Sequence, residues 1–287
     1  MSIKTILALP VEPQTRQSVL DTALGIAGYF DAHIDVAFIR YLALSYADAA
    51  GDEMAVHIAG ELMEKQEQAL NEGEAETRAL YDAFVRQHGL PPGDGEPAAA
   101  PSAAWMTLEG HPAEAIGAHG GAYDLIVTGR PAATRGLGLI TTEAALFGTG
   151  RPVIVAPPQP PRRIGETVLV AWNRGLQATR AFHAAKTLLL GKAKRVRILS
   201  ITTGARQGPT AGAIAGNLQR HGIRADVLEL SPDYRSVGEV VLAEASAIHA
   251  DLVVMGAFSH SRLRQLILGG VTRYVFEHAE LPVLMAH

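Results

Sequence analysis

The chain contains a long-period internal repeat, and this feature restricts its fold more than any other. Three apolar segments of the first half recur in the same order in the second half. The pairs are TILALPV at 5–11 with TVLVAWN at 167–173, YDLIVTG at 123–129 with ADLVVMG at 250–256, and RPVIVAPP at 151–158 with LPVLMAH at 281–287. Each copy is long enough to bury a core of its own, so the repeat predicts two homologous domains and not a solenoid. We place these domains at residues 1–160 and 165–287.

Short runs rich in Val, Ile and Leu alternate with helical patterns along each half. In the second half the expected strands are Val168–Trp172, Val196–Ile201, Ala225–Leu230, Leu252–Met255 and Pro282–Met285. The expected helices between them are Thr179–Leu190, Ala211–His221, Val237–His249 and Thr272–His278. Continuous apolar strands interleaved with helices predict an α/β fold, with a doubly wound, five-stranded parallel sheet in each domain. Ligands of such sheets bind outside the carboxyl ends of the strands, where we expect Asn173 and Gly256 to meet.

The first half carries an insertion that the second half lacks. Thr5 and Asp124 are 119 residues apart, whereas Thr167 and Asp251 are 84 apart, which leaves 35 additional residues between about 41 and 102. The segment predicts one long helix, followed by a helix stop and a flexible connector over 91–104. Its broken apolar stripe is formed by Ile58, Leu62, Ala69, Leu70, Leu80, Tyr81 and Phe84. We weigh a lid or partner surface against a lengthened crossover helix that lies on its own sheet, and favour the latter.

The composition excludes several classes of function. The 287 residues are 48% hydrophobic and 19% charged with a net charge of −4, so the chain lacks the basic face that nucleic-acid binding requires. The absence of cysteine excludes disulfides, thiolate catalysis and cysteine-ligated metals, and the histidines show no metal-ligand spacing. No apolar stretch is long enough for a membrane span, and the N-terminus predicts a first strand rather than a signal peptide. We therefore expect a soluble, cytoplasmic protein without nucleic-acid, membrane or protein-bound metal partners.

A glycine-rich segment near the end of the chain has the arrangement of a phosphate cradle. The apolar run that ends at Met255 is followed by Gly256 and Ser259, and then by Gly269 and Gly270, which open the next helix. Glycines let the backbone approach a ligand closely, and a helix start offers free N–H groups to phosphate oxygens. An ordinary strand–turn–helix connection, with glycines only for its turns, would show the same pattern.

The tandem halves, the AWN at 171–173 and the closing segment GAFSHSRLRQLILGGVTRYVFEHAELPVLMAH at 256–287 together resemble the universal stress protein family, in its two-domain bacterial form. The resemblance implies five-stranded parallel α/β domains of the Rossmann-like, adenine-nucleotide α-hydrolase-like type. It also implies a cytoplasmic protein of stress or growth arrest. One subgroup of the family binds ATP through Gly-x2-Gly-x9-Gly-Ser/Thr and an Asp after the first strand.

Only part of the ATP motif is present in this sequence. Gly256 and Gly269 match its first and third glycines, Ser259 and Gly270 replace its second glycine and its Ser/Thr, and Asn173 replaces the Asp. An amide keeps an acceptor oxygen but loses the charge, and Gly270 keeps its backbone N–H. The resemblance implies a site for ATP with Mg2+ in the second domain. Its candidate residues are Ala171, Asn173, Met255, Gly256, Ser259, Gly269, Gly270, Val271 and Thr272.

The first half departs further from the motif. Val11 occupies the position of Asn173, and the interval from Gly129 to Pro152 is three residues shorter than that from Gly256 to Pro282, which removes the Gly-x9-Gly spacing. We expect a degenerate nucleotide site there, and a packing surface that pairs with the second domain about a pseudo-twofold axis. A homodimer of the whole chain is a further expectation.

The resemblance favours a protein whose partner binding or oligomeric state is switched by a nucleotide. In this interpretation a bound adenine nucleotide orders residues 256–270 and changes the exposed surface. Two alternatives stay open: a scaffold that acts without ATP, and a slow nucleotide hydrolase. Gly191-Lys192 is not part of a P-loop, and no hydrolase or metalloprotease motif is present. His260 and Arg262 lie in the cradle loop without an evident catalytic partner. We therefore name no catalytic residue and do not expect an enzyme.

Overall fold

A computed structural model describes residues 2–42, 53–93, 100–132, 136–201, 208–231, 234–257 and 270–287. Strands and helices alternate through both halves. The first half contains β1 (Thr5–Leu9), α1 (Arg16–Phe30), β2 (His33–Arg40), α2 (Glu53–His88), β3 (Ser102–Glu109), α3 (Pro112–Gly120), β4 (Leu125–Gly129), α4 (Leu137–Gly148) and β5 (Val153–Ala156). The second contains β6 (Thr167–Trp172), α5 (Leu176–Leu188), β7 (Arg195–Ile201), α6 (Ala211–Arg220), β8 (Ala225–Leu230), α7 (Val237–Ala247), β9 (Leu252–Gly256), α8 (Gly270–His278) and β10 (Val283–Ala286).

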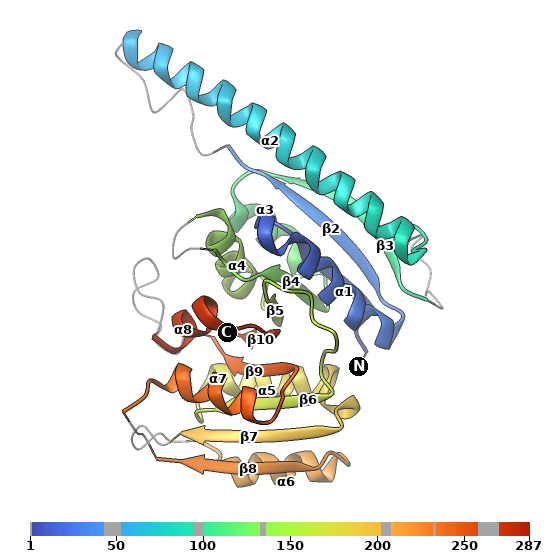
Figure 1. The fold of residues 1–287 in the computed structure, drawn as a ribbon, viewed down its shortest axis with the longest axis vertical. Coiled ribbons are helices and arrows are strands. Elements are labelled where there is room, and N and C mark those ends of the chain that lie inside the picture. The colour runs from blue at the N-terminus through green and yellow to red at the C-terminus, as the bar shows by residue number, and fades with distance from the viewer. Residues whose placement is uncertain are drawn as a thin grey trace.

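The strands form one ten-stranded sheet in the order β3-β2-β1-β4-β5-β10-β9-β6-β7-β8. Neighbouring strands within each half are parallel, and only β5 and β10, which join the halves, are antiparallel. Counted outward from the β5–β10 junction, the strands of the second half therefore follow the same order as the corresponding strands of the first half (Figure 1). The predicted α/β fold with a doubly wound parallel sheet is confirmed, and the second-half elements lie within a few residues of their predicted positions. No helix among the described residues is long and apolar enough to cross a membrane.

The internal repeat is visible in matching hydrogen bonds. The carboxylate of Asp124, just before β4, accepts the backbone N–H groups of Lys4 and Thr5 at the start of β1. Its counterpart Asp251, just before β9, accepts those of Gly165, Glu166 and Thr167 at the start of β6. Each half thus fixes the register of its first and fourth strands with one aspartate, because a strand start leaves N–H groups that a carboxylate satisfies.

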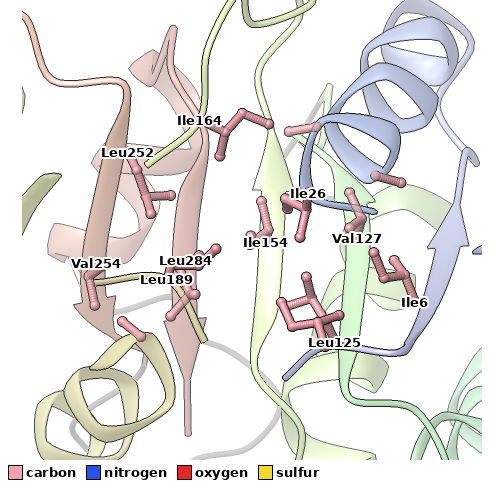
Figure 2. Packing of buried hydrophobic residues seen from close by; sticks show 14 of the residues in the cluster. Ile6, Ile26, Leu125, Val127, Ile154, Ile164, Leu189, Leu252, Val254 and Leu284 are labelled. Carbon is pink, nitrogen blue, oxygen red and sulfur yellow. The ribbon is translucent and has the colours of Figure 1, made fainter. Parts of the chain in front are cut away.

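The hydrophobic core continues across the junction. Ile154 of β5 and Leu284 of β10 are directly paired in register and are both fully buried. In Figure 2, Ile26 and Val127 lie on the first-half side of this pair, and Leu252 and Val254 lie on the second-half side. Ile164, in the segment between the halves, packs into the same cluster. Burying an aliphatic side chain contributes about 1.5–3 kcal/mol, so this shared cluster binds the two halves to one another.

The insertion is one 36-residue helix, α2, that connects β2 to β3. Its C-terminal part lies on its own sheet, where Phe84 is 2% exposed and the Tyr81 hydroxyl donates to the Ala103 carbonyl. Its N-terminal part extends beyond the sheet (Figure 1), and the side chains of Ile58 and Leu62 are 50% and 47% exposed. The prediction that this helix lies on its own sheet is therefore correct for the C-terminal part of the apolar stripe, and not for its N-terminal part. The connector expected over 91–104 is also shorter than predicted, because β3 begins at Ser102.

Two ion pairs hold the middle of α2 against the body. Arg40 of β2 donates to Glu74 at 2.8 Å, and Arg16 of α1 donates to Glu76 at 3.1 Å. Arg40 also donates to Asn71 at 2.6 Å. The polar residues in the stripe between Leu70 and Leu80 thus contact the sheet side of the helix, which explains why the apolar pattern of the sequence is interrupted there.

Candidate functional site

The carboxyl edge of the second half brings part of the predicted site together. Ala171 of β6 and Met255 of β9 are paired in register, so Asn173 and Gly256 follow the two strands at the same edge. β6 is hydrogen-bonded to β7 on its other side, so the strand order reverses between β6 and β9. Such a reversal is the place where doubly wound sheets open a crevice for ligands.

Gly256 has a packing role at this edge. A Cβ at Gly256 would overlap the backbone nitrogen of Ala178 and lie 2.7 Å from the carbonyl carbon of Gln177, both in the first turn of α5. Its counterpart Gly129 packs in the same way, since a Cβ there would overlap the Thr15 hydroxyl at the start of α1. Both halves therefore require glycine for close approach of a strand end to a helix, whether or not a ligand binds.

Asn173 forms the turn that leads from β6 into α5. Its Oδ1 accepts the Gly175 backbone N–H at 2.9 Å, and the intervening Arg174 has a positive φ of 62°. Asn and Asp favour such turns because their side chains bond their own backbone two residues on. The acceptor oxygen of Asn173 is thus used locally, while its side chain is exposed and its Nδ2 group is directed to no protein acceptor in the described part of the chain.

The start of α8 supplies the third part of the site. The helix begins at Gly270, which is exposed and has no atom of the described residues within 4 Å of where a Cβ would be, and Thr272 is buried two residues on. The first N–H groups of a helix lack intrahelical partners and form a ready anion site. Ser259 and Gly269 lie outside the described residues, as do His260 and Arg262. Of the nine predicted site residues, seven are described; Ala171, Asn173, Met255 and Gly256 share the edge, and Gly270, Val271 and Thr272 form the helix start.

The structure adds residues at this edge that the motif comparison did not select. Ser200, near the end of β7, is buried opposite Trp172, whose indole N–H donates to the Pro209 carbonyl at 2.9 Å. Gly208 approaches Arg174 so closely that a Cβ would overlap the Arg174 carbonyl oxygen. Applying the carboxyl-end rule to β7 as well as to β6 and β9 would have selected Ser200 from the sequence. No cluster of metal-ligating side chains is found among the described residues.

The equivalent edge of the first half carries a carboxylate of its own. A Cβ at Gly138, in the first turn of α4, would overlap the Glu12 carboxylate and lie 2.6 Å from its carboxyl carbon. The Gln14 side chain donates to the same carboxylate at 3.4 Å. A negative charge near a helix start is favourable. The first half thus has the Glu12 carboxylate beside the first turn of α4.

Comparison with known proteins gives a family for the second half and a fold for the whole chain. The sequence profile of the Universal stress protein family matches residues 166–287. A universal stress protein of Archaeoglobus fulgidus DSM 4304 is 18% identical, with 98% of this chain and 97% of that chain covered and a TM-score of 0.65. A functionally unknown protein of Pseudomonas aeruginosa PAO1 is also 18% identical, with 98% and 92% covered and a TM-score of 0.54. No curated protein sequence matches the chain.

Proposed function

Residues 166–287 belong to the universal stress protein family, and on that premise we propose that this half binds an adenine nucleotide, ATP together with Mg2+. The observation that supports the proposal is that Asn173 and Gly256 follow paired strands at the reversal of strand order, with α8, which begins at Gly270, next in the chain after β9. Binding would switch the surface presented to a partner or to a second copy of the chain, as part of a cytoplasmic stress response.

Each described residue has a chemical task in this proposal. The backbone N–H groups at Gly270 and Val271 donate to phosphate oxygens, and Gly270 leaves room for them to approach. The Asn173 Nδ2 group offers donors to the sugar or the base. The backbone at Ala171 and Met255 forms the floor of the crevice. The residues described directly after β6 and β9 include no Asp, Glu or Lys, which favours binding over turnover.

Calorimetric titration of nucleotide-stripped protein with ATP and Mg2+ tests the proposal. We expect about one equivalent per chain, and binding at least roughly tenfold weaker in Gly270→Glu, because a carboxylate at the helix start repels the phosphates. Gly270→Gln is the matched control, since it has the same size without the charge, and it retains most of the affinity. Both substitutions meet no atom of the described residues within 4 Å of the Cβ, so we expect both variants to fold, and circular dichroism checks this.

A scaffold that acts without ATP is the second candidate, and two observations favour it. The packing of Gly256 on α5 and the local bond of the Asn173 oxygen both explain site residues without a ligand. Absence of heat, together with absence of thermal stabilisation at millimolar ATP, would establish this candidate and exclude the nucleotide switch. A third candidate, slow hydrolysis, would appear as phosphate release in the same samples.

A further inference from the structure

A pocket of about 430 Å³ lies at the junction of the two halves, beside the first-half edge described above, and its described lining includes none of the candidate nucleotide-site residues of the second half. The first half contributes residues that follow β4 and β5, among them Arg130 and Pro158. The second half contributes Arg273, Phe276 and Glu277 of α8. The volume is within the range of about 300–1,000 Å³ that is typical of small-molecule sites.

One of the two arginines in the wall is held in a fixed position. Arg130 donates through Nη1 to the carbonyl oxygens of Glu277 and Ala279, and to the Glu280 carboxylate, each at 3.2 Å. These acceptors cluster at the C-terminal end of α8, where the helix dipole favours a cation. All three bonds use the same nitrogen. The Nε and Nη2 groups of Arg130 have no acceptor among the described residues, and its side chain is 20% exposed.

The second arginine also has unused donors. Arg273 donates through Nε to Glu277 at 2.8 Å, which leaves both of its terminal nitrogens without an acceptor in the described chain. Among the described lining residues there are two arginines and a single carboxylate, that of Glu277, which is already paired. An oxyanion would satisfy the remaining guanidinium donors, for which charge-assisted hydrogen bonds are the strong type.

Part of the remaining wall is apolar, beside the polar side chains of Gln14 and Thr15. Pro131, Leu139 and Phe276 are buried residues that line the pocket. Fixed charged groups beside an apolar wall are typical of sites for small organic ligands with one anionic end. The α4 start, by contrast, already faces the Glu12 carboxylate, so an anion in this pocket would use the guanidinium groups and not that helix.

We propose that this junction pocket is a second ligand site, which binds a small organic anion, a carboxylate or a phosphate ester with an apolar body. The site needs both halves of the chain, because each contributes one arginine. It is separate from the candidate nucleotide site, yet α8 begins at Gly270 in that site and lines the pocket from Arg273 onward. A ligand here contacts the same short helix and could alter nucleotide binding through it.

Three probes with the same ring test the proposal: phenyl phosphate, benzoate and the neutral benzamide. We expect ligand-observed NMR to show at least one of the two anions binding more tightly than benzamide, at concentrations up to about 10 mM. Preference between the two anions identifies phosphate or carboxylate as the recognised group. The same titrations in Gly270→Glu separate this site from the nucleotide site, and anion binding persists there.

Two variants locate the binding. Ala132→Glu adds a negative charge from an exposed lining residue, and Arg273→Gln removes a positive charge from a side chain that is 57% exposed, so both are expected to fold. Each should weaken the anion about fivefold or more. Arg78→Gln is the matched control, because Arg78 is 51% exposed and forms an equivalent i,i+4 ion pair far from the pocket. The inference is overturned if neither anion binds, if both variants bind like the wild type, or if Gly270→Glu abolishes binding.

Discussion

The two halves share their sheet but differ at the edge where a ligand would bind. Both use an aspartate, Asp124 or Asp251, to clamp the start of the first strand, and both use a glycine to bring the fourth strand against a helix. Beside the next helix, however, the first half has the Glu12 carboxylate, whereas in the second half no described atom lies within 4 Å of where a Cβ of Gly270 would be. The two halves are thus alike in the residues that pack the sheet, and differ in the residues near the proposed phosphate site.

The largest expected effects concern the junction that makes the two halves one body. Ile154→Ala and Leu284→Ala each remove a fully buried side chain, and each should lower the free energy of unfolding by about 2–5 kcal/mol. Because the two residues are paired across the junction, the double variant should deviate from additivity by about 0.5–3 kcal/mol. Urea unfolding measures all three. Strict additivity, with two separate transitions, would mean that the halves are independent.

A smaller difference is expected between the two packing glycines. Gly256→Ala forces a methyl group onto the backbone of α5, whereas Gly129→Ala meets the side chain of Thr15. A side chain can rotate away and a helix backbone cannot, so Gly256→Ala should cost about 1–3 kcal/mol and Gly129→Ala less. Chemical denaturation in the absence of nucleotide compares them. Equal stability of the two variants would show that the α5 backbone accommodates the methyl group.

A third test removes the carboxylate near the start of α4 and, in a separate variant, adds one at the start of α8. Glu12→Gln removes the carboxylate from the start of α4 and should destabilise the protein by about 0.3–1 kcal/mol, because the helix dipole favours a negative charge there. Gly270→Glu places a carboxylate at the start of α8 and should stabilise the nucleotide-free protein by a similar amount. Thermal unfolding at low ionic strength is the measurement. A stabilising Glu12→Gln would show that this carboxylate is not engaged with the helix.

A fourth test concerns the pH dependence that arises from Asp35 in the first half. Burial raises the pKa of Asp35, but hydrogen bonds from His33 and from the Tyr123 hydroxyl at 2.9 Å outweigh it and hold the pKa below its ordinary value. A lowered carboxyl pKa contributes stability above the unfolded-state value, and this contribution is lost as the pH falls through the folded-state value. The second half has Arg197 at the corresponding position, by strand register.

Tyr123→Phe tests this contribution. The variant should be less stable than the wild type at pH 7 by about 1 kcal/mol, the contribution of one such hydrogen bond. The difference should shrink as the pH falls through the folded-state pKa of Asp35, because the carboxyl is then protonated in both proteins. Urea unfolding at several pH values measures it. A difference that is constant with pH would assign the effect to packing of the ring instead.

The sequence alone predicted the strands, the helices and the duplicated sheet, because these follow from local apolar periodicity and from the repeat. It also placed Asn173 and Gly256 at one edge, since the carboxyl ends of parallel strands must meet. It did not reveal that Gly256 packs on α5 or that Glu12 lies against Gly138, because both contacts join segments whose spacing carries no pattern. The projection of α2 beyond the sheet was missed for a related reason: an apolar stripe does not indicate where the sheet beneath it ends.

The most direct test of the nucleotide site is amide hydrogen exchange with and without ATP and Mg2+, resolved along the chain. We expect added protection in residues 171–178 and 253–275 of the second half, and none in residues 9–16 and 129–140 of the first. Equal protection at both edges would contradict the expected loss of the nucleotide site from the first half. Unchanged exchange throughout the chain would contradict the nucleotide site itself.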